Sequence, residues 1–185
     1  RFNYYIQKLR DNKNWLLAFQ YYPLRKYNLK LAKFPDRYEY QYTKKDLFNY
    51  FKVSKNKKIT HSPQFHAGNF FIKKNIKSKK FLEDWIKVFE KNFGLIDDTP
   101  SKTKNFNGFI ENRHDQSVFS ILCKKNFINS LSAYEHDWAM KKNLRTWEYT
   151  CSPFLAKRDL KYNFFRRFVV RQTKNLKRRM NKFKL

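Results

Sequence analysis

Residues 111–123 read Glu111-Asn-Arg-His-Asp-Gln-Ser-Val-Phe-Ser-Ile-Leu-Cys123, and they join a dense polar cluster to a nearly continuous apolar run. Asp115 stands where an N-cap or first-turn residue favours the dipole of the helix that follows. Because almost every residue from Val118 to Cys123 is apolar, we predict that this helix is mostly buried.

A second amphipathic helix is predicted upstream of this stretch. Ser78 can cap a helix over residues 79–92, where apolar residues recur on one face, and Gly94 can close it. The segment 95–109 carries acidic residues, proline and glycine, which predicts a loop.

Two short apolar runs, residues 14–20 and 69–72, are typical of buried strands. Between them, residues 21–42 predict an ordered but irregular loop. Thr43 with Asp46 has the spacing of a helix start, and the helix is expected to end at residues 56–58.

Composition limits the class of protein. The chain has 185 residues, 42 Lys and Arg against 15 Asp and Glu, and a formal net charge of +27. With 20 Phe, 12 Tyr and 4 Trp it has enough apolar area for one core, which argues against disorder. No run is long and apolar enough to span a membrane, and two cysteines are too few for a disulfide framework.

The charge is concentrated in the last part of the chain. Residues 157–185 contain 12 basic residues and one acidic residue, with apolar residues at multiples of four, and predict a basic amphipathic helix. Such a helix can lie on an anionic membrane through residues 160–183, pack on its own domain, or follow nucleic acid. Nucleic acid is disfavoured because no RNP-like, Gly-x-x-Gly or zinc-finger spacing occurs.

The polar cluster itself has two interpretations. Asp115 and Gln116 can hold sugar hydroxyls, with Arg113 and His114 facing phosphate or a metal, or the cluster can simply cap the helix. A metal site at His61 and His66 needs a third ligand from elsewhere in the chain, with His136, Asp137 or His114 as the options, and no metal site is assigned. Serine-nucleophile, Walker, Rossmann and H-E-x-x-H patterns are absent.

Four stretches taken in order resemble a family of bacterial GT-A-like glycosyltransferases, the nucleotide-sugar-dependent enzymes of capsule and lipooligosaccharide assembly. They are Tyr42-Thr-Lys-Lys-Asp-Leu-Phe48, Gln64-Phe-His-Ala-Gly68, Gly94-Leu-Ile-Asp-Asp98 and Glu111-Asn-Arg-His-Asp-Gln-Ser117. The resemblance covers about residues 14–158. The same order is similar to the galactosyltransferases related to glycogenin, which have an Asn-(Ala/Ser)-Gly strand and a later Asp-Gln-Asp, although Ser117 stands here in place of the last Asp.

The resemblance implies an α/β fold, with a partial GT-A-like domain over residues 1–156 followed by the basic tail over 157–185. No Asp-x-Asp motif or nucleotide-binding half occurs, and the chain starts at Arg1 instead of Met. We therefore expect the C-terminal, acceptor-side portion of a longer enzyme. The parent enzyme is expected to use Mn²⁺ or Mg²⁺, whose ligands are not identified in this chain.

The resemblance also implies roles for individual residues. Asp115 and Gln116 are the expected catalytic residues. The expected substrate-binding residues are Gln64, His66, Ala67, Gly68, Arg113, His114, Lys157 and Arg158. The last two, in a longer protein, would close over the diphosphate, and the alternative is that they only belong to the basic tail.

The expected reaction moves a sugar from a nucleotide-diphosphate sugar to a glycan or lipid-linked glycan acceptor. The expected location is cytoplasmic, peripheral at the inner face of the cell membrane. The alternatives are a non-catalytic basic module that binds nucleic acid and a membrane-surface adaptor whose polar cluster merely caps a helix.

Overall fold

The computed structural model describes residues 2–11, 14–22, 37–136, 140–141, 144–145, 168–169 and 172–173. In chain order the elements are α1 (Phe2–Asp11), β1 (Leu16–Gln20), α2 (Glu39–Tyr42), α3 (Lys45–Tyr50), α4 (Lys57–Thr60), β2 (Phe65–Ile72), α5 (Ile76–Lys91), the 3-10 turn η1 (Phe93–Leu95), α6 (His114–Lys125), β3 (Ser130–Ser132), the 3-10 turn η2 (Ala133–Glu135), β4 (Met140–Lys141) and β5 (Leu144–Arg145). The mixed α/β class predicted from the sequence is confirmed, while the finer GT-A-like architecture remains a prediction.

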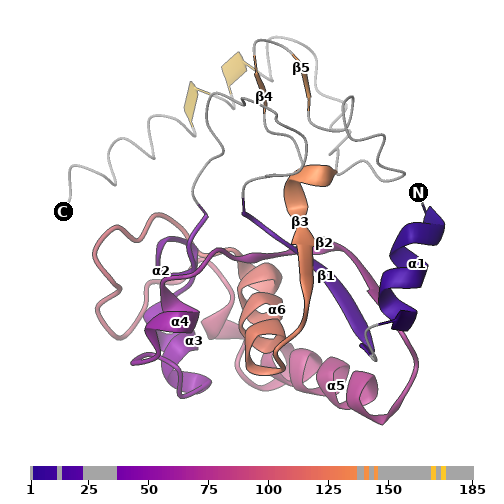
Figure 1. Ribbon diagram of the computed structural model, residues 1–185. Coiled ribbons are helices and arrows are strands. Elements are labelled where there is room, and N and C mark those ends of the chain that lie inside the picture. The colour runs from indigo at the N-terminus through magenta and orange to yellow at the C-terminus, as the bar shows by residue number, and fades with distance from the viewer. Residues whose placement is uncertain are drawn as a thin grey trace.

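The sheet has three strands in the order β2-β1-β3 (Figure 1). The central strand β1 pairs with β2 antiparallel, with Phe19 opposite His66, and with β3 parallel, with Ala18 opposite Ser130. A bulge interrupts the β1–β2 register between Leu17 and Phe19. Both predicted strands are confirmed, and the second begins earlier than expected, at Phe65. β4 and β5 form a separate short antiparallel pair.

Strand β1 is buried on both faces because its alternating side chains enter two different cores. Leu16 and Ala18 pack in the first core, with residues of α3, α5 and α6. Leu17 and Phe19 pack in the second core, with residues of α1 and η2. Figure 1 shows α1 on one side of the sheet and α5 and α6 on the other. The sheet is thus the middle of three layers, and each fully buried Leu or Phe contributes roughly 1.5–3 kcal/mol.

Helix α5 confirms the amphipathic prediction with a shifted start. Its N-cap is Asn75, whose side chain accepts a hydrogen bond from the Ser78 amide, while the Ser78 hydroxyl accepts one from the Asn75 amide. Ser78 is therefore the third helical residue of a reciprocal capping box and not the cap. Gly94 does not close the helix either: α5 ends at Lys91 and Gly94 lies inside η1.

In place of the single helix predicted from Thr43, the structure has two short helices, α3 and α4. Thr43 does not cap α3, because its hydroxyl donates to Glu39 Oε2 at 2.8 Å, and the N-cap is Lys44. Helix α3 ends at Tyr50, and Asn56 begins α4 by accepting from the Lys58 amide at 3.1 Å. The preceding loop also contains a helix that was not predicted, α2.

The loop between η1 and α6 is held against the start of α3. Asp46 accepts hydrogen bonds from the amides of Lys102 and Thr103, and Asn112 accepts one from the Lys44 amide. The Lys44 ammonium donates to Asp97 Oδ1 at 3.0 Å. These contacts fix the chain that enters α6, where the polar cluster lies.

Only part of the basic tail is described, and the boundary at residues 156–157 lies outside the described residues. Phe168, Val169, Gln172 and Thr173 are helical, and the Thr173 hydroxyl donates to the Val169 carbonyl at 2.9 Å. Phe168 and Val169 are exposed. Among the described residues, no helix is long and apolar enough to cross a membrane.

Candidate functional site

The polar residues singled out in the sequence meet at one edge of the sheet. The parallel strands β1 and β3 both end there, β2 begins there, and the Tyr21 amide donates to the Gln64 carbonyl at 2.9 Å. The start of α6 is joined to the same edge, because Gln116 Nε2 donates to Gln64 Oε1 at 2.9 Å. The carboxyl ends of parallel strands are a common position for ligand sites in α/β proteins.

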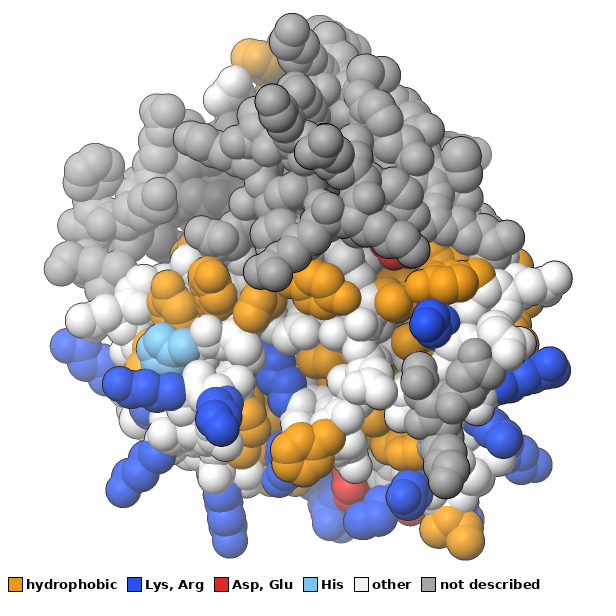
Figure 2. All heavy atoms as spheres, in the orientation of Figure 1, with side chains coloured by type: hydrophobic (Ala, Val, Ile, Leu, Met, Phe, Trp, Pro, Cys, Tyr) orange, Lys and Arg blue, Asp and Glu red, His pale blue; other side chains and the backbone are white. Residues whose placement is uncertain are grey.

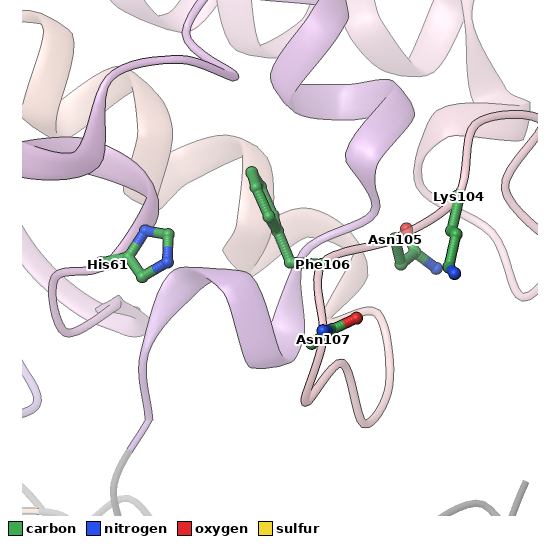
Figure 3. A pocket seen from close by; sticks show the side chains of 5 residues that line it. All are labelled: His61, Lys104, Asn105, Phe106 and Asn107. Atoms are coloured by element: carbon green, nitrogen blue, oxygen red, sulfur yellow. The ribbon is translucent and has the colours of Figure 1, made fainter. Parts of the chain in front are cut away.

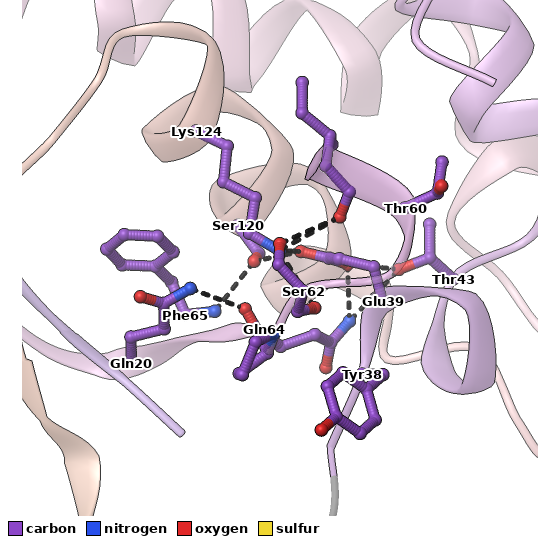
Figure 4. A network of polar contacts seen from close by, with 12 residues as sticks. Gln20, Tyr38, Glu39, Thr43, Thr60, Ser62, Gln64, Phe65, Ser120 and Lys124 are labelled. Carbon is purple, nitrogen blue, oxygen red and sulfur yellow. Dashed lines mark hydrogen bonds and ion pairs between the residues drawn. The ribbon is translucent and has the colours of Figure 1, made fainter. Parts of the chain in front are cut away.

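A buried carboxylate organises this edge (Figure 4). The Glu39 side chain is fully buried and accepts four hydrogen bonds. Thr43 and Gln64 donate to Oε2 at 2.8 and 3.0 Å, while Ser120 and Lys124 donate to Oε1, the Lys124 ammonium at 2.8 Å. A buried charge requires this degree of pairing, so we assign the network to the rigidity of the site.

The network reaches both the sheet and helix α6. The Ser120 hydroxyl accepts from the Phe65 amide of β2 at 2.7 Å, and Lys124 also donates to the Ser62 carbonyl at 3.3 Å. Burial lowers the pKa of the Lys124 ammonium, and the Glu39 carboxylate opposes that effect. Helix α6 is therefore tied to the start of β2 by polar contacts as well as by its apolar face.

Two arginines flank the network, each on the face of a tyrosine. The guanidinium of Arg113 lies 4.6 Å from the Tyr42 ring centre, and that of Arg37 lies 4.3 Å from the Tyr21 ring centre. Burial lowers the pKa of Arg113, and the positive charge of Arg37 lowers it further. Arginine nevertheless stays protonated at neutral pH.

The donors of Arg113 are only partly used. Its terminal nitrogen lies 3.5 Å from Glu111 Oε1, and its Nε is buried with no hydrogen-bond partner in the part of the chain that the structure describes. A buried donor without a partner next to a second cation is a suitable contact for an anionic group. Arg37 is held at this edge by its backbone, whose carbonyl accepts from the Gln64 amide at 2.7 Å.

His66 lies on the face of β2 that is turned toward the second core. Its Nδ1 is 3.4 Å from Nε2 of the fully buried His136, and its ring meets the Tyr21 ring edge to face. A Cβ at Gly68 would come within 2.6 Å of His66 Cε1, so the histidine ring occupies the space above the glycine. Gly68 thus allows the position of His66, as a close approach of side chain to backbone requires.

The other predicted site residues that the structure describes make no side-chain hydrogen bond to this cluster. Asp115 is exposed in the first turn of α6, directly before Gln116, and its carboxylate makes no hydrogen bond or ion pair with another described residue. His114, which has a positive φ of 45°, is 3.1 Å from Asp98 on the loop side. Ala67 packs against the first core. Lys157 and Arg158 lie outside the described residues.

Sequence reasoning missed several residues of this site. Glu39 and Arg37 fall in the stretch that was expected to be an irregular loop. One signal was present: Ser117, Ser120 and Lys124 form a polar stripe at i, i+3 and i+7 on a helix that is otherwise apolar. Such a stripe on a buried helix indicates buried polar partners from another segment.

A pocket of about 400 Å³ lies elsewhere, between His61 at the end of α4 and the loop that leads into α6 (Figure 3). It is lined by His61, Lys104, Asn105, Phe106 and Asn107. The rings of His61 and Phe106 already touch edge to face, with centres 5.6 Å apart, so no planar group fits between them. No residue predicted to bind substrate lines it.

The described residues contain no group of three or more His, Cys, Asp or Glu side chains placed to hold a metal ion. The expected Mn²⁺ or Mg²⁺ therefore has no identified ligands in this part of the chain. Burial raises the pKa of the Cys123 thiol well above its usual value, which makes this cysteine a poor nucleophile.

No protein-family model, curated protein or solved structure matches this chain.

Proposed function

We propose that this chain is the acceptor-side part of a sugar transferase that uses a nucleotide-diphosphate sugar and modifies a cell-surface glycan. One observation carries the proposal. Arg113, whose buried Nε has no hydrogen-bond partner among the described residues, adjoins the Gln64–Gln116 amide pair at the carboxyl edge of the sheet, where the Arg37 carbonyl accepts from the Gln64 amide. An unused guanidinium donor suits an anionic group, and the amides beside it suit sugar hydroxyls.

In this proposal the two arginines hold the diphosphate by charge-assisted hydrogen bonds, which are strong where the guanidinium is partly desolvated. Gln116 holds the donor sugar, and His66 with Gly68 shapes the binding site at this edge of the sheet. Asp115 orients or deprotonates the acceptor hydroxyl, a role that its exposed carboxylate leaves open to an incoming molecule.

The divalent cation, Mn²⁺ or Mg²⁺, would offset diphosphate charge in the parent enzyme. Lys157 and Arg158 would close over the same group. The basic tail over 160–183 would place the protein at the inner face of the membrane, where a lipid-linked acceptor is reached.

Thermal unfolding in the presence of nucleotide-diphosphate sugars, with and without Mn²⁺, tests the proposal. A ligand at about 100 times its Kd stabilises the folded state by about 2.7 kcal/mol, which raises Tm by roughly 5–10 °C for a chain of this size. Arg113→Met and Arg37→Met should each weaken binding roughly 10- to 100-fold, because each removes a charge-assisted contact of about 1.5–3 kcal/mol. Arg10→Met, at an exposed position in the last turn of α1, is the matched control and should bind like the wild type.

The net charge of +27 favours a second candidate, a basic module that binds polyanions. In that case RNA or anionic vesicles stabilise the chain, binding falls steeply with salt, and all three arginine variants behave alike. That result, without any shift from nucleotide sugars, would contradict the transferase proposal.

A further inference from the structure

The buried Glu39 carboxylate fixes which end of the Gln64 side-chain amide, the NH₂ or the oxygen, faces it. An ionised carboxylate accepts hydrogen bonds and donates none, so the group that faces Glu39 Oε2 is the NH₂ of Gln64, at 3.0 Å. The same nitrogen donates to Thr43 Oγ1 at 3.0 Å. With its nitrogen held in this way, Gln64 has its carbonyl oxygen on the opposite side.

The Gln64 carbonyl oxygen in turn fixes the orientation of the Gln116 side-chain amide. Gln64 Oε1 accepts from Gln116 Nε2 at 2.9 Å, which is possible only when Gln116 turns its own NH₂ inward. The Gln116 carbonyl oxygen then points away from the network. It makes no hydrogen bond to any described residue, and the side chain is only partly buried.

We infer that Glu39 is a positioning residue that acts through Gln64 to present the carbonyl oxygen of Gln116 to the site, so that the ligand group bound there is a hydrogen-bond donor. Arg113 is the N-cap residue of α6, and its carbonyl accepts from the Gln116 amide at 2.9 Å, so the two residues adjoin at the start of the helix. A cation for an anionic group stands beside an acceptor for an O–H or N–H group. The matching ligand class is a phosphorylated molecule that carries hydroxyl groups. Identifying that molecule as the donor sugar rests on the proposed function.

The hydrogen-bonded series Glu39–Gln64–Gln116, called the relay below, can be tested without any ligand. The test introduces a titratable group at position 116. In Gln116→Glu, an ionised carboxylate would face the Gln64 carbonyl oxygen, acceptor against acceptor, so the protonated form is favoured. In Gln64→Met with Gln116→Glu, that opposing oxygen is gone. Both variants keep Arg37 and Arg113, so the effect of those charges on the new carboxyl cancels in the comparison.

The expected result is a carboxyl pKa that is higher by about one unit or more in the single variant than in the double variant, measured by carbon NMR titration of labelled glutamate. Adding Glu39→Gln with Lys124→Met to Gln116→Glu removes the charge that orients Gln64, and should lower the pKa toward that of the double variant. Equal pKa values in Gln116→Glu and in the double variant would overturn the relay. That comparison tests the Gln64–Gln116 step alone. The variant that adds Glu39→Gln with Lys124→Met tests Glu39 itself and leaves no uncompensated buried charge to prevent folding. A pKa in that variant equal to the pKa in Gln116→Glu would overturn the positioning role of Glu39.

The ligand class has its own readout. If Gln116 accepts from a sugar hydroxyl, replacing that hydroxyl by fluorine in the nucleotide sugar should weaken binding roughly tenfold in the wild type and have little effect in Gln116→Met. Loss at no hydroxyl position would overturn the assignment of a donor ligand. Absence of any nucleotide-sugar binding would instead reject the proposed function, while the NMR comparison would still report on the relay.

Discussion

The Lys124→Met substitution probes the buried ion pair that supports the site. Lys124 and Glu39 are 7% and 0% exposed, and their charged atoms are 2.8 Å apart. Removing one partner of a buried pair costs about 3–5 kcal/mol, because the remaining charge is left uncompensated. Three other donors still contact Glu39, so we expect the lower end of the range, about 3 kcal/mol, or roughly 6–12 °C in Tm.

The assay is equilibrium denaturation in urea followed by tryptophan fluorescence, since Trp15 and Trp85 both lie in or against the first core. The companion change Glu39→Gln with Lys124→Met replaces the ion pair by neutral groups and should return stability to within about 1–2 kcal/mol of the wild type. Lys80→Met is the matched control. Its ammonium is exposed and 3.5 Å from Asp84, so the loss should be at most about 0.5 kcal/mol.

The reasoning is refuted if Lys124→Met costs no more than this surface control. It is also refuted if the double variant is less stable than Lys124→Met alone, since neutralising Glu39 should remove the uncompensated charge.

Two further predictions concern the loop that leads into α6. Hydrogen bonds, first from Thr99 and then from Lys44, lower the pKa of Asp97 from its usual 3.8 to about 2, so its stabilising effect is present above about pH 4 and is lost as the pH falls through about 2. Asp97→Asn should therefore flatten the fall in stability over that window in acid titrations, and an unchanged slope would speak against the bonding. Gly108 has a φ of +84°, whereas a Cβ at Gly94 meets nothing within 4 Å. In urea denaturation, Gly108→Ala should therefore lower the free energy of unfolding by about 1–2 kcal/mol and Gly94→Ala by less than about 0.5 kcal/mol. Equal losses would contradict backbone strain at Gly108.

The elements that were predicted correctly are those whose signal is local. The apolar runs that became β1 and β2, and the apolar patterns of α5 and α6, each lie within one short stretch of sequence, so hydrophobic spacing alone identifies them. Asp115 was correctly placed in the first turn of its helix. The cap of α5 was placed at Ser78 instead of Asn75 because both residue types cap helices, and only the fold decides which one does.

The features that were missed depend on contacts between distant segments. Thr43 looked like a helix cap, yet its hydroxyl is used by a buried carboxylate that is supported from α6. Nothing near Glu39 in the sequence shows that Lys124, 85 positions away, will pair with it. For the candidate site, the sequence supplied Gln64, Arg113 and Gln116, whereas the buried support could be found only in three dimensions.

The parallel pairing of β1 with β3 has a consequence for how the chain folds. Gln20 and Ser130 hydrogen-bond across 110 positions of sequence, and Tyr5 donates to Glu135 across 130. The chain loses the entropy of closing such long loops before the contacts that stabilise them have formed. Folding is therefore slow compared with that of a chain whose contacts are local. The site edge needs β1, β2 and α6 all in place, so it should be among the last parts of the molecule to form. In refolding experiments, competence to bind a ligand at this edge should therefore appear with the slowest phase, after the helical signal has recovered.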